Sequence, residues 1–552
     1  MKNMPSIPMP FLEDHTMTSR TGKYLQSLLL IPPIVAASLL GTRWFNQQSP
    51  APAAKPITQA APVSEQSRRE YVLEVIGMGV TLDKYRQGKL WEALQKGNPH
   101  ASIREQDIQK YTWDEMERSG IAGGRGGDTL ENGARETPMY FGVPVFNAEP
   151  SIHDTDMLDT PDSPTIGLAA GAAPSGLHWH LFLAGARRFG EYPDRILGDV
   201  FAFFDANPDV PYIVLNSEDS MSTRDLYRPD GSPSLVRNGY YIPEMPDASA
   251  LFVLARRERI DAVRKFAFDD APPEDSVDDL NNYGVARRLY LAYDELTRKV
   301  PVSNAGSSVG RVPTIEEWLP VAAQFARRTD IRGTGSFSRL DKLHGRNYHP
   351  PKDWQPTPWF PMPFNREQLA QLDRLPTLGF IHRPTFVTMV DADGKLLTRR
   401  DQREQALQAG WREALRSLPE TERPAAPARL VAATGGDTQQ LITLHRTLMK
   451  HAEDGGTELD SGNPAQWIDT DRRLGNTGAA TWFVQIAIGL MGSYRDGGVS
   501  AAVNLRNPRE ASIVLVSPPP EEKRRTQQHP NGGDVFGHHG TPAIDPANYP
   551  AN

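Results

Sequence analysis

The chain contains no cysteine among its 552 residues. Disulfide bonds, thiolate metal sites and cysteine nucleophiles are therefore excluded. The chain also lacks a large excess of either sign of charge, because its formal net charge is only −8. No basic block is long enough to follow a phosphate backbone. Nucleic acid is consequently not expected as a partner. The lack of cysteine does not decide the compartment, since reducing and oxidising compartments both hold cysteine-free proteins.

Long hydrophobic runs are scarce as well, and the one that bears on localisation is Leu28–Leu40, near the N-terminus. It has 13 residues and is interrupted by Pro32 and Pro33, whereas a spanning helix needs about 20 apolar residues. The LLGTRWF sequence at its end is a poor site for signal-peptide cleavage. Two interpretations stay open, a marginal single-pass anchor and a failed or vestigial signal segment.

The chain is too long for one ordinary core, since domains average about 150 residues. Composition divides it into an N-terminal apolar segment with a Pro- and Ala-rich linker (1–67), a first α/β half (68–370), a second α/β half (371–517) and a disordered tail (518–552). Strands and helices alternate in both halves, which predicts an α/β fold with a mixed or mostly parallel sheet and long irregular loops. Buried strands are predicted at residues 71–80, 212–215, 249–255, 385–390, 430–433, 499–503 and 512–516.

Two glycine-rich stretches in the first half suggest nucleotide binding but match it poorly. Gly77 and Gly79 stand near the end of the predicted strand 71–80, yet the third glycine of the dinucleotide fingerprint is missing, so the pair is interpreted as a tight strand-to-helix turn. SGIAGGRGGD, at Ser119–Asp128, lacks the Lys-Ser/Thr of a phosphate-binding loop and is predicted to be a flexible loop.

The second half has an order of elements that can be compared with a known fold. From Leu430 to Val516 a strand, a glycine turn, a helix, a G-N-T-G-A-A loop, a buried helix and two strands follow one another. This order resembles the C-terminal half of thiolase-fold condensing enzymes. Their initiating ketoacyl synthases carry a G-N-T-x-A-A loop that presents an oxyanion-binding Asn, and the resemblance implies that Asn476 holds that position. Asp437 or Thr438 is predicted to cap the helix after the glycine turn.

The catalytic partners of such a loop are missing from the sequence. Those synthases attack through a cysteine, which this chain lacks, and VAATGGDT (Val431–Thr438) has no histidine where many of them carry one. Without a nucleophile and its base the covalent route is absent. Asn476 is therefore interpreted as a residue that orders the loop or caps a helix.

Other short motifs also lack the context that their chemistry requires. Gly306–Gly310 matches G-x-S-x-G, but a serine hydrolase acting through Ser308 would need a buried strand before the motif and a helix directly after it. His178 and His180 could bind a metal, yet no third ligand stands at helpful spacing, and they are interpreted as packing or surface histidines. The sequence thus assigns no catalytic, cofactor-binding or metal-binding residue.

Four sequence blocks, spread over about Arg68 to Val516, resemble the type VI secretion lipase adaptor family. They are LEVIGMGVTLDKYRQGKLWEALQKG, PSGLHWHLFLAGARRFG, PYIVLNSEDS and LGNTGAATWF. The resemblance implies a non-enzymatic adaptor or chaperone that binds a phospholipase effector and helps load it onto the valine–glycine repeat spike protein, which carries the toxin into a competitor. Loading precedes export, so a cytoplasmic protein is expected, either free or weakly tethered to the inner membrane through Leu28–Leu40. The alternatives are a divergent thiolase-like acyl-binding protein, a serine hydrolase and a membrane-anchored structural component.

The segment WQPTPWFPMPF is the predicted contact surface for a partner. A Pro-rich backbone loses little conformational entropy on binding, and exposed aromatic side chains are good anchors. The candidate partner-binding residues are Trp354, Trp359, Phe360 and Phe364. The alternative interpretation is a loop that packs over the sheet.

Overall fold

The computed structural model describes residues 70–139, 141–151, 177, 180–229, 231–269, 285–299, 312–328 and 352–539. The apolar run Leu28–Leu40 and the Gly306–Gly310 motif lie outside these ranges. Contacts separate Met1–Pro62 from Val63–Asn552, and everything described belongs to the second unit. Within the described ranges, no helix combines the length and the apolar character that a membrane span requires.

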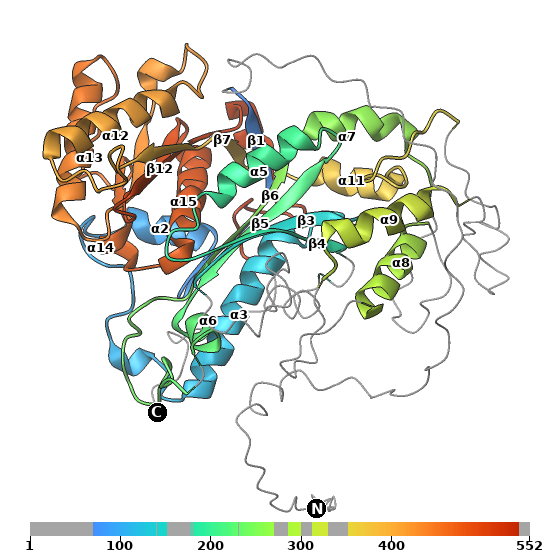
Figure 1. Cartoon of the computed structure of the whole chain (residues 1–552), viewed down its shortest axis with the longest axis horizontal. Helices are drawn as coiled ribbons and strands as arrows, with labels where there is room; N and C mark the ends of the chain where they lie inside the picture. Colours follow the sequence, from blue (N-terminus) through green and yellow to red (C-terminus); the bar gives the residue numbers. More distant parts are fainter. Residues whose placement is uncertain are drawn as a thin grey trace, which may run out of the picture. The chain divides into compact units, whose positions relative to one another are not determined.

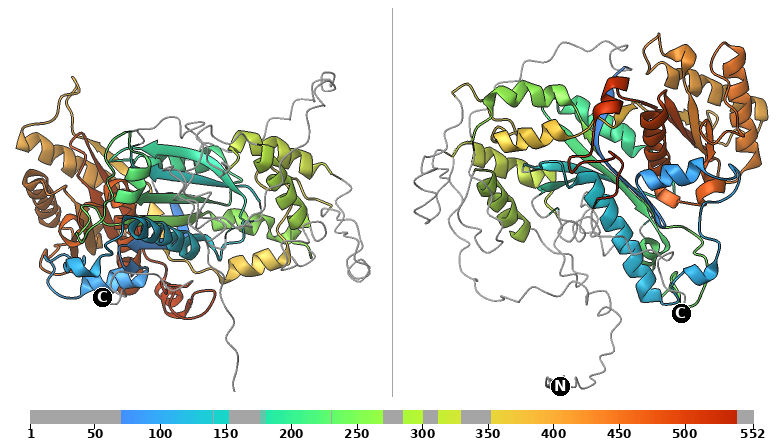
Figure 2. Two further views of the ribbon diagram at one scale, coloured as in Figure 1. Left: turned by 90° about the horizontal axis from the view of Figure 1, so that it is seen from below. Right: turned by 180° about the vertical axis from the view of Figure 1, so that it is seen from behind.

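The described strands form one mixed sheet of 12 strands, which confirms the predicted α/β class (Figures 1 and 2). The strands are β1 (Val72–Leu82), β2 (Tyr85–Arg86), β3 (Val143–Glu149), β4 (Phe182–Phe189), β5 (Tyr212–Asp219), β6 (Ala248–Ala255), β7 (Gly379–His382), β8 (Thr385–Thr388), β9 (Arg429–Ala433), β10 (Trp467–Asp469), β11 (Ser500–Asn504) and β12 (Glu510–Ser517). Ten of them follow the order β10-β9-β11-β12-β7-β1-β6-β5-β3-β4, while β2 pairs with β1 and β8 pairs with β12.

Strand β1 joins the N-terminal and C-terminal parts of the sheet. It pairs antiparallel with β6, where Thr81 faces Ser249, and antiparallel with β7, where Leu73 faces Ile381. The core nevertheless has two hydrophobic clusters, one drawn from both parts of the chain and one formed by side chains between residues 387 and 515. The division into halves near residue 370 stays a prediction.

Helices pack against the strands of the sheet (Figure 1). They are α2 (Gly88–Gln95), α3 (Glu115–Ala134), α5 (Ile196–Ala206), α6 (Met221–Leu226), α7 (Arg257–Val263), α8 (Val285–Lys299), α9 (Ile315–Ala326), α11 (Arg366–Arg374), α12 (Arg400–Leu415), α13 (Thr438–Glu453), α14 (Thr470–Leu474), α15 (Thr481–Asp496) and α16 (Glu521–Thr526). Helix α15 contacts β9, β11 and β12 as well as β6 and α2, so its residues 481–494 are all buried. The predicted buried helix after the G-N-T loop is confirmed.

Gly77 and Gly79 lie inside β1 and not in a turn, so the predicted strand-to-helix turn is wrong. An added Cβ at Gly79 would stand 1.9 Å from the carbonyl oxygen of Thr129, and one at Gly77 would stand 2.3 Å from that of Gly133. Both carbonyls belong to α3. The glycines therefore let a helix backbone lie directly on the strand, which no residue with a side chain would allow.

Helix α3 also contains Ser119–Asp128, so the predicted flexible loop is wrong as well. Its N-terminus is fixed by Asp114, whose carboxylate accepts hydrogen bonds from the backbone N–H groups of Met116 (2.7 Å) and Glu117 (3.2 Å). Further along, the Thr129 hydroxyl lies 2.9 Å from a threonine hydroxyl on β1 and 2.6 Å from a serine hydroxyl on β6. These long-range contacts override the low helix propensity of the glycines.

The tail was expected to be disordered from residue 518, and the structure corrects this up to residue 539. Helix α16 lies in this part, and the side chain of Phe536 is buried against Tyr494, with 5.3 Å between ring centroids. The Phe536 carbonyl also accepts a 2.9 Å hydrogen bond from the N–H of Gly88, at the start of α2. Local composition gave no sign of these two contacts with the body of the fold.

Candidate functional site

The G-N-T-G-A-A loop connects α14 to α15 and passes close to β5 from the first half. Gly475 ends α14 with φ 83°, and Gly478 has φ 55°, a left-handed conformation that favours glycine. An added Cβ at Gly478 would stand 1.9 Å from Oδ2 of Asp219. Both the backbone conformation and the lack of space therefore require glycine there, and the loop backbone rests directly on a carboxylate.

Asn476 orders this loop through its side-chain carbonyl. Oδ1 accepts hydrogen bonds from the N–H of Gly478 (3.0 Å) and from Nη2 of Arg506 (2.5 Å). The same guanidinium donates through Nη1 to the Gly478 carbonyl (2.7 Å) and to the hydroxyl of Thr481. The loop-ordering interpretation of Asn476 is confirmed, because its Oδ1 is engaged by the loop and by Arg506.

Asp219 is the residue that fastens the loop to the first half, and sequence reasoning missed it. Oδ2 accepts a 2.7 Å hydrogen bond from the N–H of Ala479, and Arg224 donates through Nε (2.8 Å) and Nη2 (2.7 Å). Arg224 also pairs with Glu191 at 2.7 Å. The Asp219 side chain is fully buried, and burial raises its pKa although Arg224 and the Ala479 N–H oppose the rise. The polar run NSEDS at the end of a buried strand was the signal available in the sequence.

Further acidic groups lie beside Asp219 at the ends of parallel strands β3 and β5. Burial raises the pKa of Glu218 to about 7, with repulsion from Glu149 and Asp219 acting in the same direction. Glu149 pairs with Arg187 at 2.8 Å, and both side chains are only 1% exposed. Burial also raises the pKa of Glu149 in spite of this ion pair. Glu218 can therefore carry a proton near neutral pH. Acid–base catalysis would also require a reacting group within hydrogen-bond reach of this carboxyl.

The hydroxyl groups near this cluster have structural hydrogen bonds in place of an activating base. Ser217 donates its O–H to the carbonyl of Ala479 at 3.5 Å, and the Ser220 hydroxyl caps α6 by accepting from the N–H of Thr223 at 2.9 Å. An activated serine would instead donate to a base within hydrogen-bond reach. The geometry around Asp219 is therefore that of a structural joint between two parts of the sheet.

A cavity of about 450 Å³ opens beside Asn476. It is lined by Tyr192, Thr434, Gly435, Gly436, Asp437, Gln440, Asp471, Asn476, Leu505, Arg506 and Pro508. Its two carboxylates bind backbone N–H groups: Asp471 accepts from Thr434 (2.5 Å) and Gly435 (2.8 Å), and Asp437 caps α13 by accepting from Gln439 (2.7 Å). The predicted cap at Asp437 is confirmed. Most of the lining residues are polar or glycine, while Leu505, Pro508 and Tyr192 supply apolar surface.

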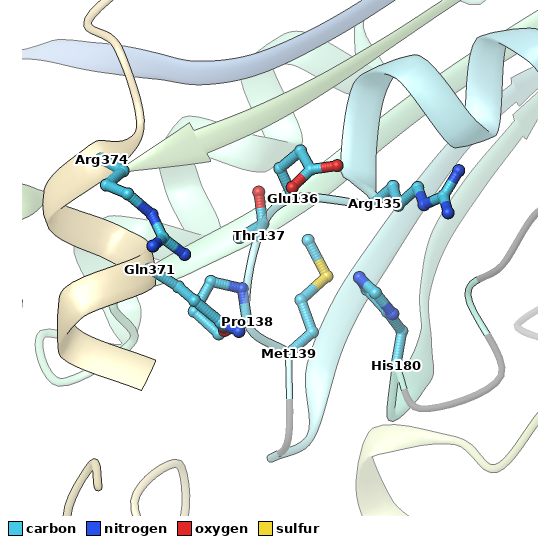
Figure 3. Close-up of a pocket in the computed structure, with 8 residues that line it drawn as sticks. All are labelled: Arg135, Glu136, Thr137, Pro138, Met139, His180, Gln371 and Arg374. Atoms are coloured by element: carbon cyan, nitrogen blue, oxygen red, sulfur yellow. The ribbon is translucent and has the colours of Figure 1, made fainter. Parts of the chain in front are cut away.

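A second cavity, of about 90 Å³, contains His180, one of the two histidines considered as metal ligands (Figure 3). Its Nε2 lies 3.0 Å from the carbonyl of Ala134, and its ring packs against Phe182 with 5.6 Å between centroids. His178 lies outside the described residues. Among the residues that the structure does describe, no three His, Asp or Glu side chains gather as a metal site would need.

The four aromatic residues predicted to contact a partner lie in the core, so the premise that they are exposed is wrong. Trp354, Trp359, Phe360 and Phe364 are exposed by only 7, 4, 2 and 1%. The rings of Phe360 and Phe364 pack against that of Phe141 at 5.2 and 5.1 Å, and Trp359 packs edge-on against a phenylalanine of α5 at 5.6 Å. Aromatic rings gain more by this packing than by exposure. A partner-binding role for WQPTPWFPMPF stays a prediction, and its four aromatic side chains are too buried to serve as the exposed anchors on which it was based.

Comparison with family models gives two matches to this chain. The model described as "Type VI lipase adapter protein Tla3, N-terminal" matches residues 71–238, and the one described as "Type VI lipase adapter protein Tla3, C-terminal" matches residues 378–518. Together they cover more than half of the chain. The joint described above connects them, since Asp219 lies in the first match and Asn476 in the second.

Solved structures similar to this chain include several ketosynthases. The ishigamide ketosynthase/chain length factor has a TM-score of 0.38 and 11% identity over 81% of this chain and 99% of that one. A ketosynthase from module 6 of the bacillaene synthase of Bacillus subtilis 168 has a TM-score of 0.38 and 10% identity, covering 82% of this chain and 71% of that one. OleA of Xanthomonas campestris has a TM-score of 0.35 and 9% identity over 81% and 99%. These likenesses are too distant to assign an architecture or a chemistry to this chain.

Proposed function

Because the chain belongs to the type VI lipase adapter family, we propose that it is a non-enzymatic adaptor for a phospholipase effector. In this role it binds the effector in the producing cell, keeps it in a form that can be exported and helps load it onto the valine–glycine repeat spike protein. The observation that carries the proposal is the pair of family matches, which lie on both parts of the continuous sheet. The spike protein then carries the phospholipase into a competing bacterium.

The absence of a cysteine nucleophile supports a role without catalysis. The chain has no cysteine, and Asn476, at the position of an oxyanion-binding residue, has its side-chain carbonyl engaged by Gly478 and Arg506. Asp219, the buried carboxylate nearest to the loop, is held by Arg224 and Ala479. Groups that would have to move protons or stabilise charge are thus used to hold the fold together.

The proposed place of action is the cytoplasmic side of the inner membrane. Loading onto a spike has to precede export, so the adaptor needs to meet its cargo in the cytoplasm. Leu28–Leu40 provides a weak tether to the membrane in this proposal, and removal of residues 1–45 tests it. A truncated chain that still loads its cargo would leave the tether without a function.

Co-purification tests the adaptor function directly. The full chain is expressed with phospholipases encoded beside its own gene, and complexes are separated by size-exclusion chromatography. A stable complex with a phospholipase, which the spike protein then joins, is the expected result. If the purified chain binds no phospholipase from the same genome, the adaptor function is wrong.

The two enzymatic or ligand-binding alternatives have less support. An acyl chain needs apolar walls, whereas Leu505 and Pro508 are the apolar members of the lining beside Asn476, with Tyr192 as its one aromatic ring. Ser308, on which a hydrolase would depend, lies outside the described residues. Esterase turnover that a Ser308→Ala variant abolishes would nevertheless revive the hydrolase, and acyl-CoA binding that depends on Asn476 would revive the acyl-binding protein.

A further inference from the structure

Exposed apolar side chains gather on two segments at the N-terminal end of α3. Nine large apolar side chains are exposed in the described part of the chain, and five of them lie within residues 108–116 and 235–240. These five define what is called here the Trp113 face: Ile108, Trp113, Met116, Leu235 and Tyr240. Trp113 is 51% exposed and Met116 is 56% exposed. Single exposed apolar residues are ordinary, but several on adjoining segments indicate a surface that is covered in use.

Hydrogen bonds fasten the two segments to each other. The carbonyl of Trp113 accepts a 2.8 Å hydrogen bond from the N–H of Gly239, which places Trp113 beside the neighbour of Tyr240. Two residues further on, the N–H of Glu115 donates to Oδ1 of Asn238 at 2.9 Å. The two segments therefore lie side by side, and α3 also contacts α6 (Figure 1).

A buried arginine gives this surface a fixed shape. Arg118 donates to the carbonyl oxygens of Thr112 and Gly239, and its guanidinium stacks over the ring of Tyr241 at 3.8 Å. The Tyr241 hydroxyl in turn accepts from the N–H of Arg237 at 3.1 Å. A preorganised surface loses little conformational entropy when a partner binds. Tryptophan, tyrosine and methionine are also the residue types that protein interfaces favour.

The charges next to the Trp113 face indicate what its partner carries. The segment Asp107–Arg118 contains four acidic residues, Asp107, Asp114, Glu115 and Glu117, against Lys110 and the buried Arg118. The other segment contributes one exposed base, Arg237. This border, the acidic rim, thus carries four acids against three bases, one of them buried, and a complementary partner has an apolar patch bordered by basic residues.

We propose that the Trp113 face is the docking surface for the phospholipase cargo, which meets it with an apolar patch and a basic rim. The inference rests on the proposed adaptor function and adds to it the place of contact. Trp113 and Met116 are the central anchors, since they are the most exposed members of the face; Met116 lies in the first turn of α3, and Trp113 directly precedes its N-cap, Asp114. The acidic rim steers the approach of the cargo.

Binding measurements on surface variants test this surface. The full chain, Trp113→Ala and Met116→Glu are compared for affinity to the phospholipase that the wild-type chain co-purifies with. We expect each variant to bind at least about tenfold more weakly, as central aromatic and apolar anchors do when truncated or charged. Met449→Glu, on α13, is the matched control, because this methionine is 63% exposed and lies outside the face. It is expected to bind like the wild type.

A charge reversal tests the acidic rim separately. Glu115→Lys is expected to slow association with the phospholipase severalfold at low salt and to lose most of this effect at high salt. An association rate that is unchanged at low salt would show that the rim does not meet basic residues and would overturn that part of the inference.

The possible outcomes separate this inference from the adaptor function. If the wild-type chain binds the phospholipase and the Trp113→Ala and Met116→Glu variants bind it equally well, the docking surface is wrong while the adaptor function stands. If those variants only convert a self-associating chain to a monomer, by light scattering, a second copy covers the face and the inference is overturned. If the wild-type chain binds no phospholipase, both the adaptor function and the docking surface fail.

Discussion

The carboxylate of Asp219 accepts a 2.7 Å hydrogen bond from the backbone N–H of Ala479, 260 positions further along the chain. Asp219 ends β5, and Ala479 lies in the G-N-T-G-A-A loop, two residues before α15. One buried carboxylate thus links the regions that the two family models match. The carboxylate holds the G-N-T-G-A-A loop against the end of β5.

Removal of the Asp219 carboxylate should destabilise the fold strongly. Asp219→Ala leaves the N–H of Ala479 without its acceptor and leaves Arg224 with Glu191 as its remaining carboxylate partner. We expect the free energy of unfolding to fall by about 3 kcal/mol, as when one member of a buried pair is deleted. Asp199→Ala, which removes a partly exposed pair with Arg188, is the control and should cost less than about 1 kcal/mol. Equal losses in urea titrations would contradict a special role for Asp219.

Substitution of two glycines that both have left-handed backbones distinguishes the cost of backbone strain from the cost of a steric clash. Gly478 (φ 55°) and Gly436 (φ 73°) both strain an L-residue, but an added Cβ meets Asp219 Oδ2 at 1.9 Å in the first case and nothing within 4 Å in the second. Gly436→Ala should therefore cost about 1 kcal/mol, from the backbone alone. Gly478→Ala should cost about 2 kcal/mol more, because the loop has to move. Thermal unfolding of the two variants measures the difference, and similar melting temperatures would refute the close packing.

Local sequence patterns predict those elements whose form depends on their own residues. The predicted strand at 249–255 matches β6 to within one residue, and the helical spacing from Ala479 to Met491 predicts α15. Asp437 could be predicted as a cap because an acidic side chain before an apolar-periodic segment accepts from the first turn. In each case the deciding interaction lies within a few residues.

The features that escaped prediction depend on contacts between distant residues. The glycine-rich stretch Ser119–Asp128 belongs to α3, and this helix packs on β1 further along, where Thr129 and Gly133 lie against Gly79 and Gly77. The importance of Asp219 comes from a loop in the other half of the chain, and the local NSEDS sequence contains no information about that loop. The aromatic segment from Trp354 is buried for the same reason, since its neighbours include Phe141 and α5.

Phe364 provides a direct test of where that aromatic segment lies. Its ring packs against Phe141 and Phe360 at 5.1 and 5.3 Å, and the side chain is almost completely buried. Phe364→Ala should lower the free energy of unfolding by about 3–5 kcal/mol, as expected for a large core residue. Trp113→Ala removes an exposed aromatic ring and should change it by less than about 1 kcal/mol. If Phe364→Ala unfolds at the same denaturant concentration as the wild type, the segment is not part of the core.

Glu218 should make the fold less stable as the pH rises towards neutrality. Burial raises its pKa from 4.5 to about 7, with Glu149 and Asp219 adding to the rise, so between these pH values the folded chain binds more protons than the unfolded chain. The stability that protonated Glu218 provides is therefore fully present below about pH 4.5 and is lost as the pH rises through about 7. Glu218→Gln, which cannot ionise, should be more stable than the wild type at pH 8.5, and the difference should shrink towards pH 5. Asp194, whose pKa burial raises to about 6, contributes the same trend to both proteins and cancels in the comparison. Urea titrations at several pH values measure the difference, and a constant offset between the two proteins would show that Glu218 titrates normally.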